Sequence, residues 1–346
     1  MPPRTTEPTM AKQTDAQGAY RGPALAARNL SKDYRVRTRG KGRTLHAVHD
    51  VSLEIGAGST LGVVGESGCG KSTLARLLVG LEPPTSGSIE IGGVDLAGLR
   101  GGERREVLRN VQMVFQSPYT SLDPRMTTVQ TIREPLDVWS KGRSRRQRTE
   151  AALELMAKVG LDRALADRYP NELSGGQQQR VGMARALAAG SEIVICDEPV
   201  SALDVSIQAQ VLNLLRDLQR NLGLTYVFIA HNLTVVATVS DFIAVMYLGR
   251  IVEYGRRDDV FTRPMHPYTK ALLSSAPIPD PEIEAARRPV VLHGDLPSPY
   301  DRPSGCPFRT RCPSARDVCA EQPPPVVTRD GGAHQAVCFF PDDLSQ

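Results

Sequence analysis

The sequence predicts an α/β protein with a mostly parallel sheet, an antiparallel β subdomain, a helical subdomain and a small cysteine-rich C-terminal extension. Three short, nearly continuous apolar runs at 61–64, 192–196 and 225–230 predict the parallel sheet, because strands covered on both faces lack polar alternation. Alternating apolar and polar residues over 24–55 predict antiparallel strands, and a helical period over about 99–187 predicts the helical subdomain.

We divide the 346 residues into three parts. Residues 1–23 have few large apolar side chains, so we expect a disordered tail. Residues 24–264 form the α/β domain, and residues 265–346 form the extension with a four-cysteine metal site. The net charge of +4 does not by itself require nucleic acid. The apolar runs are far shorter than the roughly 18 residues of a membrane span, so any membrane contact is expected through a partner.

The antiparallel subdomain is expected to contain two hairpins. Within 24–55 the basic stretch 37–43 separates two alternating segments and reads as a hairpin loop. Residues 89–94 contain a Gly-Gly pair, which is typical of a two-residue hairpin turn.

The helical subdomain contains two segments with clear ends. Residues 144–160 place four apolar side chains on one helical face, and Gly160 ends the helix. A second helix begins after Leu173 with the sequence Ser-Gly-Gly-Gln. Two glycines in a first helical turn cost about 1 kcal/mol each relative to alanine. We therefore expect this bare helix start, Ser174–Gln177, to bind an anion.

A phosphate-binding loop follows the first apolar strand. The sequence Gly65-x4-Gly70-Lys71-Ser72 joins that strand to a helix. Glycines leave the backbone N–H groups free to face a polyphosphate at the positive end of the helix. Lys71 is expected to meet the β- and γ-phosphates, and Ser72 to bind Mg²⁺.

Polar residues follow the other two apolar strands. Asp197 and Glu198 end one strand, and His231 follows the next. Because ligands bind at the carboxyl ends of such strands, we assign Asp197 to Mg²⁺, Glu198 to polarising the attacking water and His231 to the γ-phosphate. The structural alternatives are a helix N-cap for the two acids and a satisfied core histidine for His231.

Two further residues have weaker individual signals. Gln116 could ligand Mg²⁺ or cap a loop. Tyr34 could stack on adenine or pack on the antiparallel sheet.

Taken together, these motifs resemble the ATP-binding cassette family of P-loop NTPases, from about residue 24 to 340 when the later stretches are included. The resemblance implies ATP and Mg²⁺ as cofactors and a head-to-tail dimer, in which the Ser174–Gln177 helix start of one subunit binds the γ-phosphate held by the other. It also implies that 201–204 lies at the dimer seam, and that the surface near Gln116 receives a helix from a membrane subunit. The implied catalytic residues are Glu198 and His231, the Mg²⁺ ligands Ser72, Gln116 and Asp197, and the ATP-binding residues Tyr34, Gly65, Ser67, Gly68, Cys69, Gly70, Lys71, Ser72, Thr73, Gln116, Ser174, Gly175, Gly176 and Gln177.

Four further stretches are similar to the ATPases of dipeptide and oligopeptide importers, and closer to the second of their two paired ATPases. They are 115–124, 205–210, 265–269 and 305–313. This likeness implies an ATPase on the cytoplasmic face of the cell membrane that powers peptide import. Its partners would be a second, distinct cassette subunit, two membrane permeases and, indirectly, a solute-binding protein. A nickel or glutathione importer shares every motif, whereas a soluble cassette ATPase acting on nucleic acid would need features that the sequence lacks, such as a basic stripe interleaved with aromatics.

The extension contains a group of four cysteines, Cys306, Cys312, Cys319 and Cys338. In a reducing cytosol such a group favours metal binding over disulfides. Their spacing lacks the close pairs of most zinc sites, and four thiolates suit either zinc or a 4Fe-4S cluster. The family likeness favours the cluster, with zinc as the alternative and disulfides third.

Overall fold

The computed structural model describes residues 22–38, 41–201, 203–275, 292 and 294–341. All but the last two residues of the predicted disordered tail, 1–23, lie outside these residues. Within the described residues, none of the helices combines the length and the apolar character needed to cross a membrane.

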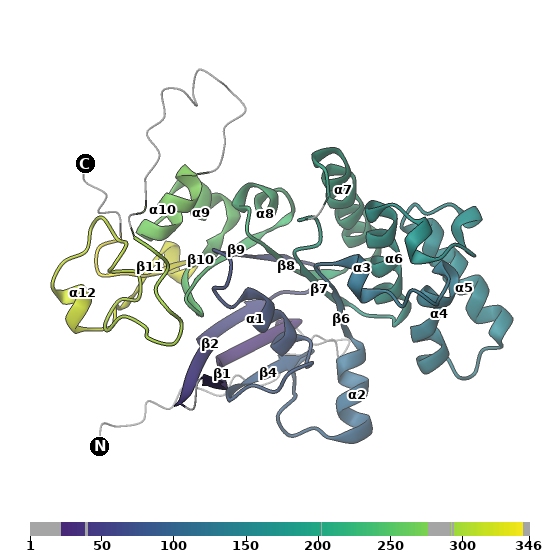
Figure 1. Ribbon diagram of the computed structural model, residues 1–346, viewed down its shortest axis with the longest axis horizontal. Coiled ribbons are helices and arrows are strands. Elements are labelled where there is room, and N and C mark those ends of the chain that lie inside the picture. The colour runs from purple at the N-terminus through teal and green to yellow at the C-terminus, as the bar shows by residue number, and fades with distance from the viewer. Residues whose placement is uncertain (1–21, 39–40, 202, 276–291, 293, 342–346) are drawn as a thin grey trace.

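An eight-stranded sheet forms the centre of the molecule (Figure 1). Five of its strands, β6, β7, β8, β3 and β9, pair in parallel, which confirms the predicted parallel sheet. The three predicted apolar strands are the neighbours β7, β8 and β3. In sheet order the strands are β6 (Val111–Val114), β7 (Ile193–Asp197), β8 (Thr225–Ala230), β3 (Thr60–Val64), β9 (Phe242–Tyr247), β10 (Arg250–Arg256), β12 (His334–Val337) and β11 (Val326–Arg329).

A four-stranded antiparallel sheet lies beside the central sheet (Figure 1). Its order is β2 (Lys41–Ile55), β1 (Leu25–Thr38), β4 (Ser86–Ile91) and β5 (Val94–Asp95). Both predicted hairpins are present, since β1 pairs with β2 and β4 with β5. In the second hairpin Gly92 and Gly93 have φ values of 56° and 75°, which glycine adopts without the steric cost of a side chain.

The helices α3 to α6 gather at one end of the molecule, away from the C-terminal segment (Figure 1). The predicted helix at 144–160 is α5, capped by the Ser144 side chain and followed by Gly160 in a left-handed conformation. The stretch expected to be helical, about 99–187, also contains the strand β6. The helices are α1 (Lys71–Leu78), α2 (Gly101–Arg109), α3 (Pro118–Ser121), α4 (Thr128–Trp139), α5 (Arg145–Lys158), α6 (Gly175–Ala188), α7 (Val205–Leu222), α8 (Leu233–Val239), α9 (Arg257–Thr262), α10 (Pro267–Ser274) and α12 (Val318–Glu321), with short 3₁₀ turns at 163–165, 170–172 and 330–332.

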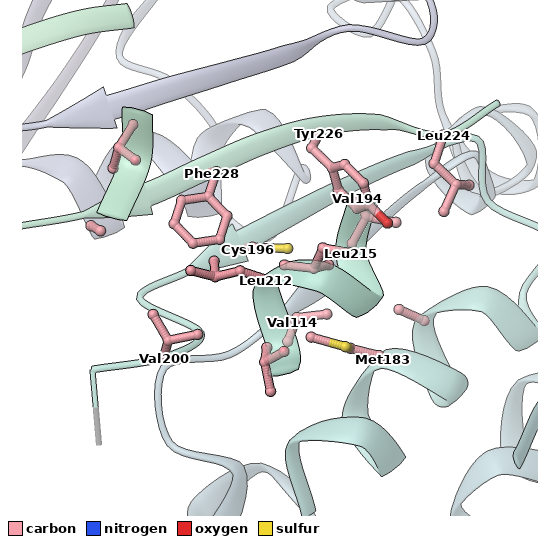
Figure 2. Close-up of a cluster of buried hydrophobic side chains, with 14 of the residues drawn as sticks. Val114, Met183, Val194, Cys196, Val200, Leu212, Leu215, Leu224, Tyr226 and Phe228 are labelled. Carbon is pink, nitrogen blue, oxygen red and sulfur yellow. The ribbon is translucent and has the colours of Figure 1, made fainter. Parts of the chain in front are cut away.

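The central strands are buried on both faces. Side chains of β8 alternate between two apolar clusters, so that Tyr226 and Phe228 belong to one and Val227 and Ile229 to the other. Figure 2 shows the first cluster, in which Phe228 lies against Leu212 of α7 and other apolar side chains. Burying apolar surface stabilises the folded state by roughly 25 cal/mol per Å². Because both faces of these strands are buried, they carry almost no polar residues.

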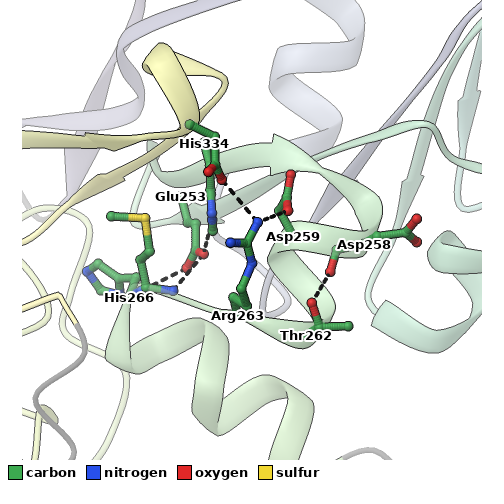
Figure 3. A network of polar contacts seen from close by, with 9 residues as sticks. Glu253, Asp258, Asp259, Thr262, Arg263, His266 and His334 are labelled. Atoms are coloured by element: carbon green, nitrogen blue, oxygen red, sulfur yellow. Dashed lines mark hydrogen bonds and ion pairs between the residues drawn. The ribbon is translucent and has the colours of Figure 1, made fainter.

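The C-terminal segment continues the central sheet, an arrangement that we did not predict. Strand β12 pairs with β10, and a buried polar group joins the two parts (Figure 3). The Glu253 carboxylate of β10 accepts hydrogen bonds from the N–H groups of Met265 and His266, each at 2.8 Å. The ring nitrogen Nε2 of His334 lies 2.8 Å from the same carboxylate. The boundary that we drew at residue 265 is therefore crossed by a shared sheet and by buried contacts.

Candidate functional site

The loop between β3 and α1 is tightly confined by neighbouring backbone. A Cβ atom on Gly65 would lie 2.1 Å from the carbonyl oxygen of Met246. One on Gly70, whose φ is +108°, would lie 2.1 Å from the carbonyl oxygen of Ala47. Real Cβ atoms do not approach that closely, so a side chain at either position would displace the loop. These two glycines thus have a packing role besides exposing the backbone.

Lys71 is buried at the base of this loop, with 4% of its surface exposed. Its ammonium group donates to the carbonyl oxygens of Gly65, at 2.7 Å, and Glu66, at 2.9 Å. The Lys71 side chain therefore folds back along the phosphate-binding loop. An ammonium group in this position can bind a phosphate that enters the loop.

A cavity of about 270 Å³ opens over the loop. Ten of the predicted site residues line it: Tyr34, Ser67, Gly68, Cys69, Gly70, Lys71, Ser72, Thr73, Gln116 and Glu198. Sequence reasoning missed six others, Leu45, His46, Ala47, Leu248, Gly249 and Pro299. These six come from segments without a recognisable motif, and only the fold brings them to the loop.

Ser72 and Asp197 provide neighbouring oxygen atoms beside the cavity. The Ser72 hydroxyl donates to Asp197 Oδ1 at 3.2 Å. Asp197 is buried at the end of β7, and burial raises the pKa of its carboxyl group, against the opposing effect of the Ser72 hydrogen bond. Hydroxyl and carboxylate oxygens are the ligands that Mg²⁺ prefers, so this pair fits the predicted magnesium site.

Glu198 lies next to two other predicted residues. Its carboxylate accepts a hydrogen bond from the Gln116 side-chain amide at 2.8 Å and lies 3.7 Å from Nδ1 of His231. Its backbone has a φ of +46°. Such a conformation is uncommon for a residue with a side chain and occurs frequently at functional sites. In this structure Gln116 contacts Glu198, and His231 lies outside the cavity over the loop, in a smaller adjoining one.

Tyr34 lines the cavity from the antiparallel sheet. Its hydroxyl donates to Glu82, and the ammonium group of Lys32 lies 5.2 Å from the centre of its ring. Burial raises the pKa of the Tyr34 hydroxyl, and the hydrogen bond to Glu82 adds to this effect. The ring is therefore fixed at its polar end while part of it borders the cavity.

The helix start Ser174–Gln177 does not line the cavity of its own chain. Ser174 and Gln177 form a capping box, in which each side chain bonds the backbone N–H of the other. A Cβ atom on Gly176 would lie 2.7 Å from Ile207 of α7. Close packing of α6 on α7 is thus a second reason for glycine here, which the sequence did not reveal. Gly175 is exposed.

The four cysteines of the extension line one small cavity of about 10 Å³. All six cysteines of the chain are free thiols. Burial raises the pKa of Cys312 to about 12 and that of Cys338 to about 11. Among the described residues, no group of three or more His, Cys, Asp or Glu side chains is arranged to hold a metal ion. The predicted metal centre is therefore not confirmed, although its four ligands are brought together.

A wide groove of about 840 Å³ lies between α2, β6, α4 and α6. Apolar side chains and arginines line it, among them Leu81, Phe115, Trp139, Arg105 and Arg185. Phe115 directly precedes Gln116, so the groove begins next to the side chain that contacts Glu198.

Two family comparisons match separate parts of the chain. Residues 48–201 match the ABC transporter family. Residues 252–319 match the C-terminal region of oligopeptide and dipeptide transporters.

Individual relatives cover most of the chain. The oligopeptide transport ATP-binding protein OppF of Salmonella typhimurium is 52% identical over 302 residues, which are 87% of this chain and 90% of that protein. OppF of Escherichia coli is 51% identical over the same coverage. Among solved structures, a dimeric post-hydrolysis state of the cassette MJ0796 bound to ADP and Pi superposes with a TM-score of 0.61 at 30% identity, covering 67% of this chain and 98% of that one.

Proposed function

Because the chain belongs to the ABC transporter family of ATP-binding proteins, we propose that it is the ATP-hydrolysing subunit of an importer for dipeptides and oligopeptides. The observation that carries this proposal is the convergence of Lys71, Ser72, Asp197 and Glu198 beside one cavity at the carboxyl edge of the parallel sheet. The peptide class rests on the relatives named for oligopeptide transport, which cover 87% of the chain, and on the family match of residues 252–319.

In the proposed reaction, the loop N–H groups and Lys71 bind the β- and γ-phosphates. The Mg²⁺ that accompanies ATP would be held by Ser72 and Asp197, with Gln116 as a further ligand, and would neutralise phosphate charge. Glu198 orients and polarises a water molecule towards the γ-phosphate, and His231 contacts that phosphate. The 3.7 Å separation of Glu198 and His231 is compatible with both side chains acting on the same group.

We propose that two cassettes close head to tail over the nucleotide. The helix start Ser174–Gln177, in which Ser174 and Gly175 are exposed, would then reach the γ-phosphate of the other subunit, because in its own chain it lies away from the cavity. The solved relative bound to ADP and Pi is a dimer. The other subunit here would be a distinct cassette paralogue. Residues 201–204 would lie at the seam, although residue 202 is outside the described part of the chain.

The groove between α2 and α4 is proposed to receive a helix of the membrane permease. Its apolar lining beside Gln116 suits an inserted amphipathic helix. ATP-driven closure could then reach the permease, provided that ATP binds more tightly to one of the two transporter states. This arrangement implies a peripheral location on the cytoplasmic face of the membrane, with a solute-binding protein on the other side.

We also propose that the four extension cysteines hold a metal centre, a 4Fe-4S cluster in preference to zinc. The support is the donor set, because four thiols from separate segments line one small cavity. Four thiolates suit either a 4Fe-4S cluster or a zinc ion, and among the described residues no group of three or more such side chains is arranged to hold a metal ion. Protein purified without oxygen should contain about four iron atoms per chain. Stoichiometric zinc would reverse the preference, and the absence of both metals would refute the site.

The function is tested by Glu198→Gln in the transporter. We expect ATP turnover and peptide uptake to fall by roughly 10² to 10⁴ fold, the usual scale for a positioned acid-base group, while ATP still binds. Glu192→Gln is the matched control, since Glu192 precedes β7 at its opposite end and is exposed. Wild-type turnover in Glu198→Gln would refute the role of Glu198. Normal peptide uptake in cells that lack the gene and its paralogues would refute the proposed transport function.

A further inference from the structure

An ion pair joins the C-terminal extension to the phosphate-binding loop. Nη1 of Arg311 lies 2.8 Å from Oε2 of Glu66, which is the first residue after Gly65 in the loop. The two residues are 245 positions apart in the chain. Their side chains are 10% and 27% exposed, respectively. By contrast, the side chains of the ion pair between Asp301 of the extension and Arg43 of β2 in the antiparallel sheet are 74% and 49% exposed, respectively.

Glu66 is held from three directions. Its N–H donates to the Tyr268 hydroxyl at 2.9 Å, and its carbonyl oxygen accepts from Lys71 at 2.9 Å. Its carboxylate is paired with Arg311. Two of these three partners, Tyr268 and Arg311, come from beyond residue 264. The conformation of the loop that carries Lys71 therefore depends on side chains outside the cassette motifs.

Arg311 is itself fixed by the extension. Its backbone N–H donates to the carbonyl oxygen of Phe308 at 3.0 Å. The Phe308 ring is buried, with its centre 5.2 Å from that of Tyr247 and 5.4 Å from that of Tyr268. Phe308 thus packs the turn that carries Arg311 against Tyr268. The Tyr268 hydroxyl in turn accepts the hydrogen bond from the Glu66 N–H. Arg311 and Tyr268 act on Glu66 as parts of one packed unit.

The electrostatics favour a paired arginine. Burial lowers the pKa of Arg311, but hydrogen bonds and charge interactions with Glu66 and Tyr247 outweigh burial and raise it overall. A mostly buried arginine–carboxylate pair is stronger and better oriented than an exposed pair. Losing Arg311 would leave the Glu66 carboxylate, which is only partly exposed, without its partner in the described structure.

We propose that Arg311 is a positioning residue for the phosphate-binding loop, so that the C-terminal extension forms a structural part of the nucleotide site. This inference rests on the proposed ATPase function. Arg311 does not touch the cavity that would hold ATP. It acts through Glu66 on the loop backbone and on Lys71, which contact phosphate before and during hydrolysis alike. Its loss should therefore weaken ATP binding more than it slows the chemical step.

The test is a titration of the full chain with a fluorescent ATP analogue, combined with ATPase kinetics of the transporter. We expect Arg311→Ala to raise the Kd and the KM for ATP by about tenfold, the scale of a hydrogen bond to a charged group, with kcat within about twofold of wild type. Glu66→Gln should cause a similar change, and the double variant should be no worse than either single variant. Arg311→Lys should restore part of the affinity, because it keeps the charge but loses the planar fork.

Arg309→Ala is the matched control. Arg309 lies in the same turn but bonds Ser304 of the extension and not the loop, so its removal should leave ATP affinity unchanged. Equal losses in Arg309→Ala and Arg311→Ala, or additive losses for Glu66 and Arg311, would overturn the inference. Unchanged affinity in a folded Arg311→Ala would overturn it too. A wild-type chain that binds no ATP would instead refute the proposed function.

Discussion

Glu198 combines the chemical and conformational features expected of a catalytic carboxylate. It is the residue on which Gln116 and His231 converge, and its φ of +46° places it in a sparsely occupied backbone conformation. The hydrogen bond from its N–H to the Ile229 carbonyl oxygen, at 2.9 Å, holds that conformation. Strain at this one position thus coincides with the group that would orient the attacking water.

The buried His266 gives the protein a defined dependence on pH. Burial lowers its pKa from 6.5 to about 4, against the attraction of the Glu253 carboxylate, and Lys270 lowers it further. Between these two values the unfolded chain binds a proton that the folded chain does not. The contribution of His266 to the free energy of unfolding is therefore greatest above pH 6.5 and decreases as the pH falls towards 4. Thermal unfolding should show a loss of about 1 kcal/mol from this residue between pH 7.5 and 5.5.

His266→Asn separates this effect from other titrating groups. The asparagine side chain can still accept the hydrogen bond from the Tyr268 N–H, which His266 Nδ1 now accepts at 3.0 Å. It does not titrate, so the variant should lose less stability on acidification than wild type, whatever its stability at pH 7.5. The same pH dependence in both proteins would contradict the assignment.

Residues within contiguous motifs could be predicted, whereas residues joined only by the fold could not. Lys71 and Ser72 are recognisable because the loop is contiguous, and Asp197 because it ends an apolar strand. Arg311 and Pro299 carry no local signal. They reach the site because the chain returns to it more than two hundred residues after the loop, and spacing along the sequence does not encode that return.

At the scale of elements, long and regular patterns predicted the structure well. The central strands β3, β7 and β8 follow from their apolar runs, the first hairpin from its alternating pattern and the second from its Gly-Gly pair. Strand β6 lies inside the stretch that we expected to be helical. We did not predict it, because its four residues are too few to show a period. Strands β11 and β12 are equally short and join the central sheet at its edge. The pairing of β12 with β10 depends on tertiary contacts such as that between His334 and Glu253.

Two glycines of helix α6 should respond in opposite ways to alanine. A Cβ atom on Gly176 would meet Ile207 at 2.7 Å, whereas one on Gly182 would have no neighbouring atom within 4 Å. Gly176→Ala should destabilise the fold by about 1–3 kcal/mol through overpacking against α7. Gly182→Ala should stabilise it by roughly 0.5–1 kcal/mol, because alanine loses less backbone entropy in a helix.

Thermal unfolding of the full-length variants measures the difference. A melting temperature for Gly176→Ala at or above that of Gly182→Ala would show that close packing on α7 does not require glycine. The bare helix start would then have phosphate binding as its remaining explanation.

At the scale of the whole molecule, the sheet connects three functional regions. The nucleotide cavity lies over the loop at its carboxyl edge, the groove proposed for the permease begins beside Gln116, and the extension adds β11 and β12 to the far edge. The extension also holds Glu66 through Arg311 and Tyr268. The cassette domain alone therefore does not form the complete nucleotide site. The extension positions the phosphate-binding loop, and a second cassette would supply the opposing helix start.

The most direct measurement is the structure of the whole transporter with Glu198→Gln and bound Mg-ATP, in which the nucleotide is retained. We expect the Ser174–Gln177 helix start of this subunit to lie within hydrogen-bond distance of the γ-phosphate held by its partner cassette, while Lys71 contacts the nucleotide in its own loop. A complex that binds ATP at Lys71 but leaves Ser174–Gln177 in solvent, far from any phosphate, would contradict the proposed shared site.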